Sequence, residues 1–120
     1  MHTVQYRSTE DLLDITWSGL FTSADMARYA LDCSDIQARE GFKAGFRLRI
    51  WLRDGHPLPQ ESLAALAGAF TDFPKPSRQA WVTTSSLVRL QIKRTMLWSY
   101  ARLFECPNEA LAWLIGPDAN

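Results

Sequence analysis

Three kinds of polar side chain in this sequence could together form a hydrolytic site: a carboxylate, an imidazole and a hydroxyl. Asp54 and His56 follow an alternating strand that ends at Arg53, and Ser85 and Ser86 follow the next expected strand. Ligands of open α/β sheets bind at this carboxyl edge, where a nucleophile, a base and an orienting acid could meet. The glycine-flanked serine of a nucleophile elbow is missing, and both serines can cap a helix. We therefore expect a protein that is not an enzyme.

The helix expected to begin at Ser85 offers free backbone amides that could hold a phosphate or a carboxylate. No glycine-rich loop accompanies these amides, and Arg89 is the basic residue nearby, so capping is the simpler explanation. The same edge of the sheet could instead carry a small apolar or anionic ligand, which is the alternative function. The residues that would form this ligand edge are Asp54, His56, Ser85, Ser86, Leu87, Leu90 and Trp98.

Metal-binding and redox chemistry find little support in the sequence. The two cysteines, Cys33 and Cys106, stand alone, and the two histidines have no zinc-site spacing to them. Cys33 also falls on the apolar stripe of an expected helix, where a buried, reduced thiol is the common state. We expect no metal, no cofactor and two reduced cysteines.

Composition places the chain among single-domain globular proteins. The 120 residues are 47% hydrophobic and 22% charged, which is enough to build one core over residues 1–120. Thirteen basic and thirteen acidic residues give a net charge of zero, which argues against nucleic acid as a partner. No apolar run is long enough for a membrane span, and the first residues lack the apolar segment of a signal peptide. A cytoplasmic location is expected.

The segment 46–53 alternates without interruption and sets the expected packing of the sheet. Phe46, Leu48, Ile50 and Leu52 point to one face, and the arginines with Trp51 point to the other. Three buried guanidiniums would each need a partner, so we expect helices to cover one face only. The other face then becomes a partner or homodimer surface, since Trp and Arg are typical interface anchors. Its expected residues are Arg47, Arg49, Trp51, Arg53 and Trp81.

The order of the segments predicts an α/β fold of the form β-β-α-β-α-β-α-β-α. Strands that alternate with helices indicate a mixed, mostly parallel five-stranded sheet with its helices mainly on one face. The expected strands are 3–7, 12–18, 46–53, 80–84 and 100–105, and the expected helices are 23–40, 59–70, 87–99 and 107–115.

Local signals support some of these elements more strongly than others. Thr22 and Asp25 have the spacing of a capping box, and Gly41 suits the end of the same helix. The segment 87–99 also alternates like a strand over its first half, but its length favours a helix. In the strand 80–84 we expect Ala80 and Val82 to face the core and Trp81 to face the open side. In the last helix we expect Leu111, Leu114 and Ile115 to point inward.

Several segments resemble the small stand-alone bacterial proteins of the STAS superfamily, which have the anti-sigma-factor-antagonist-like fold. The resemblance rests on the Thr-Trp-Ser-Gly segment 16–19, the Arg-Asp end of the strand 46–53, and the tail Leu-Phe-Glu at 103–105 followed by Glu-Ala-Leu-Ala-Trp-Leu at 109–114. It implies a regulatory domain that works by association. Members of sigma-factor switches carry a phosphorylated serine where the third strand leads into the next helix. Ser62 stands nearest that place, but it lies inside the first helical turn without an Asp-Ser-Gly motif, which argues against a phosphorylation switch.

Overall fold

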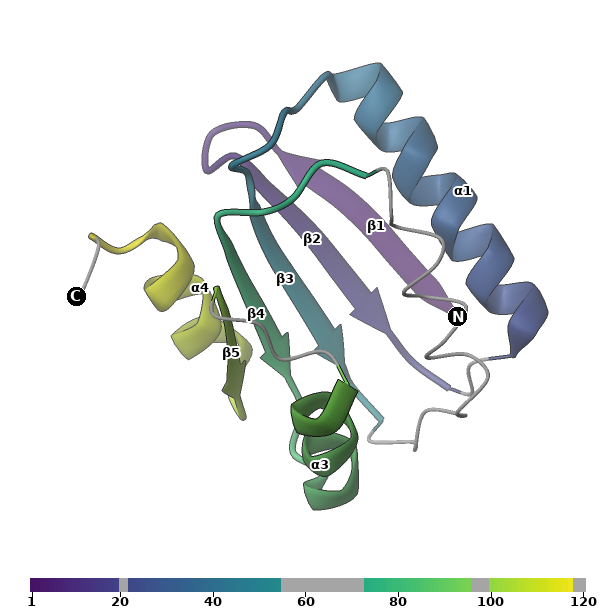
Figure 1. Cartoon of the computed structure of the whole chain (residues 1–120), viewed down its shortest axis with the longest axis vertical. Coiled ribbons are helices and arrows are strands. Elements are labelled where there is room, and N and C mark those ends of the chain that lie inside the picture. Colours follow the sequence, from purple (N-terminus) through teal and green to yellow (C-terminus); the bar gives the residue numbers. More distant parts are fainter. Residues whose placement is uncertain (20–21, 55–72, 96–99, 118–120) are drawn as a thin grey trace.

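The computed structural model describes residues 1–19, 22–54, 73–95 and 100–117, which form one sheet with helices on both of its faces (Figure 1). The strands are β1 (His2–Arg7), β2 (Leu12–Trp17), β3 (Arg47–Leu52), β4 (Arg78–Val82) and β5 (Ala101–Phe104). The described helices are α1 (Ser23–Glu40), α3 (Ser86–Thr95) and α4 (Pro107–Ile115). The helix expected at 59–70 lies outside the described residues.

The five strands lie side by side in the order in which they occur in the chain. β1 pairs with β2 antiparallel, whereas the pairs β2–β3, β3–β4 and β4–β5 are parallel. Parallel neighbours need a connection that crosses over the sheet, which α1 supplies before β3 and α3 before β5. The expected mixed, five-stranded α/β sheet is therefore confirmed.

Helix α1 begins and ends at the residues that its sequence signals predict. The Thr22 hydroxyl accepts a hydrogen bond from the Asp25 amide at 3.1 Å, and the Asp25 carboxylate accepts one from the Thr22 amide at 3.1 Å. Gly41 has a positive φ of 71°, the left-handed conformation that ends helices and that glycine adopts without a Cβ penalty. The capping box and the glycine cap are both confirmed.

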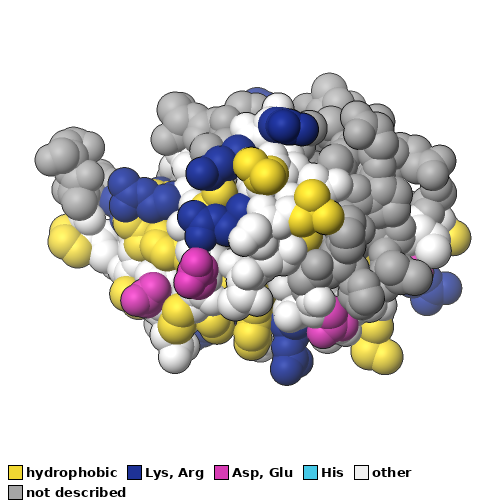
Figure 2. All heavy atoms as spheres, turned by 90° about the horizontal axis from the view of Figure 1, so that it is seen from below, with side chains coloured by type: hydrophobic (Ala, Val, Ile, Leu, Met, Phe, Trp, Pro, Cys, Tyr) yellow, Lys and Arg dark blue, Asp and Glu magenta, His cyan; other side chains and the backbone are white. Residues whose placement is uncertain are grey.

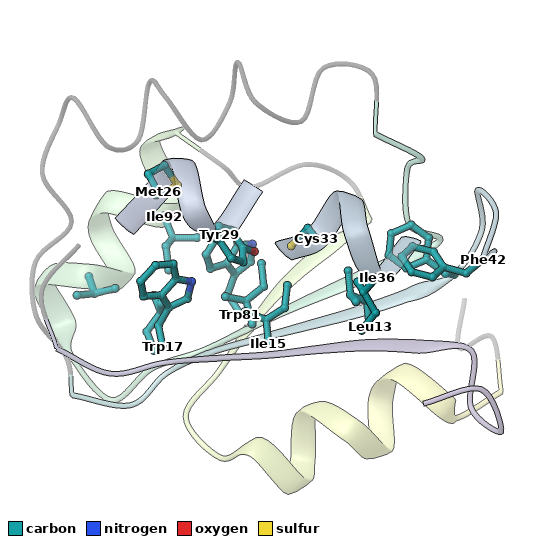
Figure 3. Packing of buried hydrophobic residues seen from close by; sticks show 14 residues of the cluster. Leu13, Ile15, Trp17, Met26, Tyr29, Cys33, Ile36, Phe42, Trp81 and Ile92 are labelled. Carbon is teal, nitrogen blue, oxygen red and sulfur yellow. The ribbon is translucent and has the colours of Figure 1, made fainter. Parts of the chain in front are cut away.

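The larger core lies between the sheet and the helices α1 and α3 (Figure 3). Leu13, Ile15 and Trp17 of β2 point into it, as their alternation predicts. Phe46, Ile50 and Leu52 are buried there as well, while Leu48 is only partly buried. Helix α1 contributes the residues of its apolar stripe, which include Met26, Tyr29, Cys33 and Ile36.

Helix α4 lies on the opposite face of the sheet from α1, which corrects the prediction that this face is open (Figure 3). Its buried residues Ala110 and Leu114 pack against Leu12 of β2 and against Ala80 and Val82 of β4. Ile115, expected to point inward, is 47% exposed. The handedness rule constrains a helix that connects two parallel strands, and α4 follows the last strand, so nothing in that rule holds it on the face of α1.

The side chain of Trp81 points into the larger core, so the prediction that it faces the open side was wrong. The parallel register pairs Trp81 with Ile50, and residues that oppose each other in neighbouring strands share a face. Trp81 is only 2% exposed, whereas Ala80 and Val82 lie under α4. A strand buried on both faces has no polar side to show which way its residues point, so alternation could not assign them.

Segment 86–95 is helical, as its length predicts. Val88 and Ile92, four residues apart, are completely buried in the larger core. Leu87 and Leu90 are 54% and 51% exposed on the other side of the same helix. The apparent alternation of 88, 90 and 92 therefore reflects apolar residues on both sides of a helix and not a strand. None of the described helices has the length and apolar character needed to cross a bilayer.

Candidate functional site

The expected ligand edge at the carboxyl ends of β3 and β4 consists, where it is described, of structural contacts. An oxygen of the Asp54 carboxylate accepts a hydrogen bond from the Gly19 amide at 2.6 Å, which ties the end of β3 to the segment after β2. The Ser85 hydroxyl accepts one from the Val88 amide at 3.3 Å, which is the geometry of a helix cap. Ser86 is the first residue of α3. His56 and Trp98 lie outside the described residues.

The two leucines expected to line a pocket at this edge point to solvent instead. Leu87 and Leu90 form an apolar strip next to the exposed basic residues Lys93 and Arg94, and these four residues are called here the outer face of α3. Figure 2 views the molecule from the end at which α3 lies and shows apolar side chains among Lys and Arg side chains. The residues that line the inner side of this helix are Val88 and Ile92.

Two members of the expected partner face are covered by the molecule's own last helix. The Arg49 guanidinium binds both oxygens of the Asp14 carboxylate, at 2.9 and 2.5 Å, and also donates to the Pro107 carbonyl at 3.0 Å. Arg47 donates to the carbonyls of Leu114 at 2.8 Å and Glu10 at 2.7 Å. These arginines therefore hold α4 on the sheet, and the three-arginine surface expected from the alternation of β3 does not exist as an open face.

Trp51 and Arg53 remain at the uncovered end of that face. The Arg53 guanidinium carbon lies 4.9 Å from the centre of the Trp51 ring, a cation–π arrangement, and Arg53 itself is exposed. Trp51 is half-buried and packs against the smaller cluster under α4. On the same face, beyond Trp51, the register places Thr16 and then Thr3, and Thr3 is exposed. Trp51 is thus the one aromatic residue of the expected partner face that still points to it.

The structure has a cavity at the opposite end of the strands that the sequence does not predict. It has a volume of about 370 Å³ and is lined by Arg47, Ser77, Arg78, Leu114 and Gly116. Arg47 begins β3, Arg78 begins β4, and the two residues are direct partners in the sheet. The sequence does show an arginine at the start of each of these two strands. Only the parallel register of β3 and β4, however, brings the two arginines together.

The titratable groups of the larger core are held in their neutral forms. Burial raises the pKa of the Cys33 thiol to about 12, and burial likewise raises the pKa of the Tyr29 hydroxyl well above its ordinary value. A protonated thiol is a poor nucleophile, so Cys33 does not fit a catalytic role. Within residues 1–19, 22–54, 73–95 and 100–117, no group of three or more His, Cys, Asp or Glu side chains is placed to hold a metal ion.

The comparisons with known proteins identify no relative: no family model, no curated protein and no solved structure matches this chain.

Proposed function

We propose that this chain is a STAS-like, non-enzymatic regulatory domain that acts by binding a protein partner or a second copy of itself. The resemblance of the segments 16–19, 103–105 and 109–114 motivates the proposal, and the sheet of strands in chain order supports it. The free thiols of Cys33 and Cys106 fit a cytoplasmic protein, which is the location we propose.

The observation that carries this proposal is the outer face of α3. Two leucine side chains that are more than half exposed, three residues apart on one helix, give a continuous apolar strip. The inner side of the helix is already anchored by Val88 and Ile92, so folding does not require the outer leucines. An exposed apolar strip with polar residues at its border is typical of a surface that docks against another protein.

The charges next to the strip favour an acidic partner over a second copy of this face. Lys93 and Arg94 are exposed at the C-terminal end of α3. The third basic residue, Arg89, is paired with Glu105 at 3.0 Å. Two copies meeting through this face would bring like charges together, whereas a partner with carboxylates around an apolar centre would match both features.

Self-association is assigned to a different surface. We propose the uncovered end of the sheet face, with Trp51 as its anchor and Arg53 stacked upon it. This surface is smaller than the alternation of β3 suggests, because α4 covers Arg47 and Arg49. A homodimer through it would accordingly be weak, since stable interfaces bury roughly 800 Å² on each partner.

The test compares variants of the two surfaces with a matched control. Leu87→Asp combined with Leu90→Asp should abolish binding of a protein captured by the wild type, once that protein is purified and its affinity is measured by calorimetry. Leu31→Asp, at a leucine on α1 that is still more exposed (65%), should leave binding unchanged. Trp51→Glu should shift any dimer to monomer in sedimentation velocity. Full partner binding by the α3 double variant, together with a wild type that is monomeric at high micromolar concentration, would refute the proposal.

A further inference from the structure

Strand β1 forms one edge of the sheet, and half of its main-chain groups point away from β2. It is the first strand in the sheet order, so in the described part of the chain only β2 pairs with it. The amino group and the carbonyl of Met1 both bond to Ser18, and along an antiparallel pair such doubly bonded residues alternate with unbonded ones. The residues of β1 that point their N–H and C=O groups outward are therefore His2, Val4 and Tyr6.

The bonds on the other side of β2 give the same assignment. The carbonyls of Asp11 and Trp17 accept from the amides of Arg47 and Arg53, so odd-numbered residues of β2 turn their main-chain groups to β3. Even-numbered residues of β2 then bond to β1, and they stand opposite the odd-numbered residues of β1. None of the six outward groups of β1 has a hydrogen-bond partner in the described part of the chain.

The sequence of β1 lacks the features that usually keep an edge strand from pairing. Such features are a proline, a bulge, a charged side chain along the strand or a very short strand. Residues 2–6 are His-Thr-Val-Gln-Tyr, and their register with β2 runs without a break. The Arg7 side chain, at the end of β1, is paired with Glu10 at 3.0 Å. The other edge strand, β5, has only four residues. Of the two edges, β1 is therefore the one suited to accept a further strand.

A strand added beside β1 would meet different surroundings on its two faces. The side chains of Val4 and Tyr6 pack against the larger core on the α1 side of the sheet. Thr3 and Gln5 alternate with them and are exposed on the other side. Residues directly opposite each other in neighbouring strands share a face. A matching strand therefore alternates apolar residues, beside Val4 and Tyr6, with polar residues beside Thr3 and Gln5.

Helix α1 distinguishes a lone strand from a second copy of this chain. The helix is tied to β1 by the His2 imidazole and the Asp32 carboxylate at 2.6 Å, and in Figure 1 it runs along the outer side of β1. A strand added about 4.8 Å from β1 would lie beneath this helix. A second copy paired through β1 would bring its own α1 to the same face of the joined sheet, and the two helices would compete for one space.

From these observations we propose that the edge of β1 binds an extended segment of a protein partner as a sixth strand, antiparallel to β1. His2, Val4 and Tyr6 supply three N–H donors and three C=O acceptors, which give affinity through the main chain, whereas the alternation of side chains gives selectivity. Antiparallel pairing is favoured because opposed residues exchange both bonds directly. This surface shares no residue with the outer face of α3, so the two surfaces can be tested separately.

The probe is the capped peptide acetyl-Lys-Val-Thr-Val-Thr-Val-Lys-amide, titrated into the full chain and followed by amide NMR. Its three valines match the three outward residues of β1, and its threonines match the exposed side. Saturable shifts are expected at the amides of His2, Val4 and Tyr6, because each gains an acceptor. Smaller shifts are expected at Thr3 and Gln5, which already bond to β2. Shifts that do not saturate would overturn the proposal.

Two methylated forms of the peptide have the same composition and mass, and both are used with the unaltered protein. Methylation of two valine amides removes donors that face β1 and should weaken binding at least about tenfold, which is the loss expected for one to two hydrogen bonds. Methylation of two threonine amides removes donors that face away from β1 and should change the affinity less than about threefold. Equal binding by the two forms would show that the peptide does not pair with the edge of β1.

A pair of protein variants tests the same edge from the other side. Val4→Pro removes one outward donor, and an edge strand tolerates proline where the N–H faces away from the sheet. It should weaken peptide binding at least about tenfold, whereas Val4→Ala keeps the amide and should stay within about threefold of the wild type. Sedimentation velocity tests the other occupant. A wild-type dimer that Val4→Pro converts to a monomer would assign the edge to a second copy and refute its assignment to a partner segment.

Discussion

The face of the sheet under α1 and α3 differs from the face under α4 in what joins helix to strand. Under α1 and α3 the contacts are mainly apolar, although His2 of β1 also binds the Asp32 carboxylate of α1 at 2.6 Å. They include the aromatic packing of Trp17 on Tyr29, with ring centres 5.2 Å apart. Under α4 only a small cluster is buried, and three arginines bind main-chain carbonyls of the helix and the residues that flank it. One face is therefore held mainly by the hydrophobic effect and the other largely by charge-assisted hydrogen bonds.

This difference explains how β3 can carry two arginines, Arg47 and Arg49, and still lie in a covered sheet. A guanidinium costs too much to bury alone, but it can be buried when each of its nitrogens has an acceptor. Asp14 and the Pro107 carbonyl supply an acceptor for each nitrogen of Arg49. Two nitrogens of the half-buried Arg47 donate to the carbonyls of Leu114 and Glu10. A polar strand face is thus not always an open face, and the helix that covers it can be recognised by the carbonyls it offers.

The largest effect is expected from Trp81→Ala, which tests the apolar face. Removing a large side chain that is 2% exposed should lower the free energy of unfolding by about 3–5 kcal/mol, because it loses buried area and leaves a cavity. Trp51→Ala should cost clearly less, because Trp51 is half-buried. Urea unfolding followed by circular dichroism measures both. Equal losses at the two positions would contradict the assignment of Trp81 to the larger core.

A smaller effect is expected from Asp14→Ala on the arginine face. The side chains of Arg49 and Asp14 are only 12% and 17% exposed, so removing the acid leaves a mostly buried guanidinium with one carbonyl partner. A loss of about 3 kcal/mol in unfolding free energy follows. An Asp–Arg pair on an open, solvent-exposed face would contribute much less to the unfolding free energy. Asp14→Ala combined with Arg49→Met should be more stable than Asp14→Ala alone.

Glu105→Ala provides the control for this pair. It removes the acid of an exposed ion pair, in which Glu105 is 68% exposed, and should change stability by less than about 0.5 kcal/mol. If Asp14→Ala costs no more than Glu105→Ala, the buried pair does not hold α4 in the way described here.

The smallest effect on the free energy of unfolding at neutral pH is expected from the titratable groups of the apolar face. Their effect grows as the pH becomes alkaline. The pKa of Cys33 is raised from its ordinary value of 9.0 to about 12, so the folded state keeps a proton that the unfolded state loses. The resulting stability is complete below pH 9 and falls as the pH rises from about 9 towards 12. Unfolding free energies measured at several pH values should show this decline. Cys33→Ala should make it shallower, and an unchanged slope would exclude Cys33 as a cause.

Much of the fold could be predicted from local signals. The capping box at Thr22 and the glycine at 41 fixed the ends of α1, because caps depend on residues within a few positions of each other. The alternation in β2 and β3 identified the sheet face that carries the larger core.

The sequence by itself determined the α/β class, most element boundaries and the apolar residues of β2 and β3, because these depend on periodicity and on short-range hydrogen bonds. Tertiary structure alone decided the side of the sheet taken by α4, the orientation of Trp81 and the meeting of Arg47 with Arg78. Each of these depends on the register between strands or on a helix that no following strand constrains. Such features depend on contacts between residues that are distant in sequence. The pattern of residues within one segment does not determine those contacts.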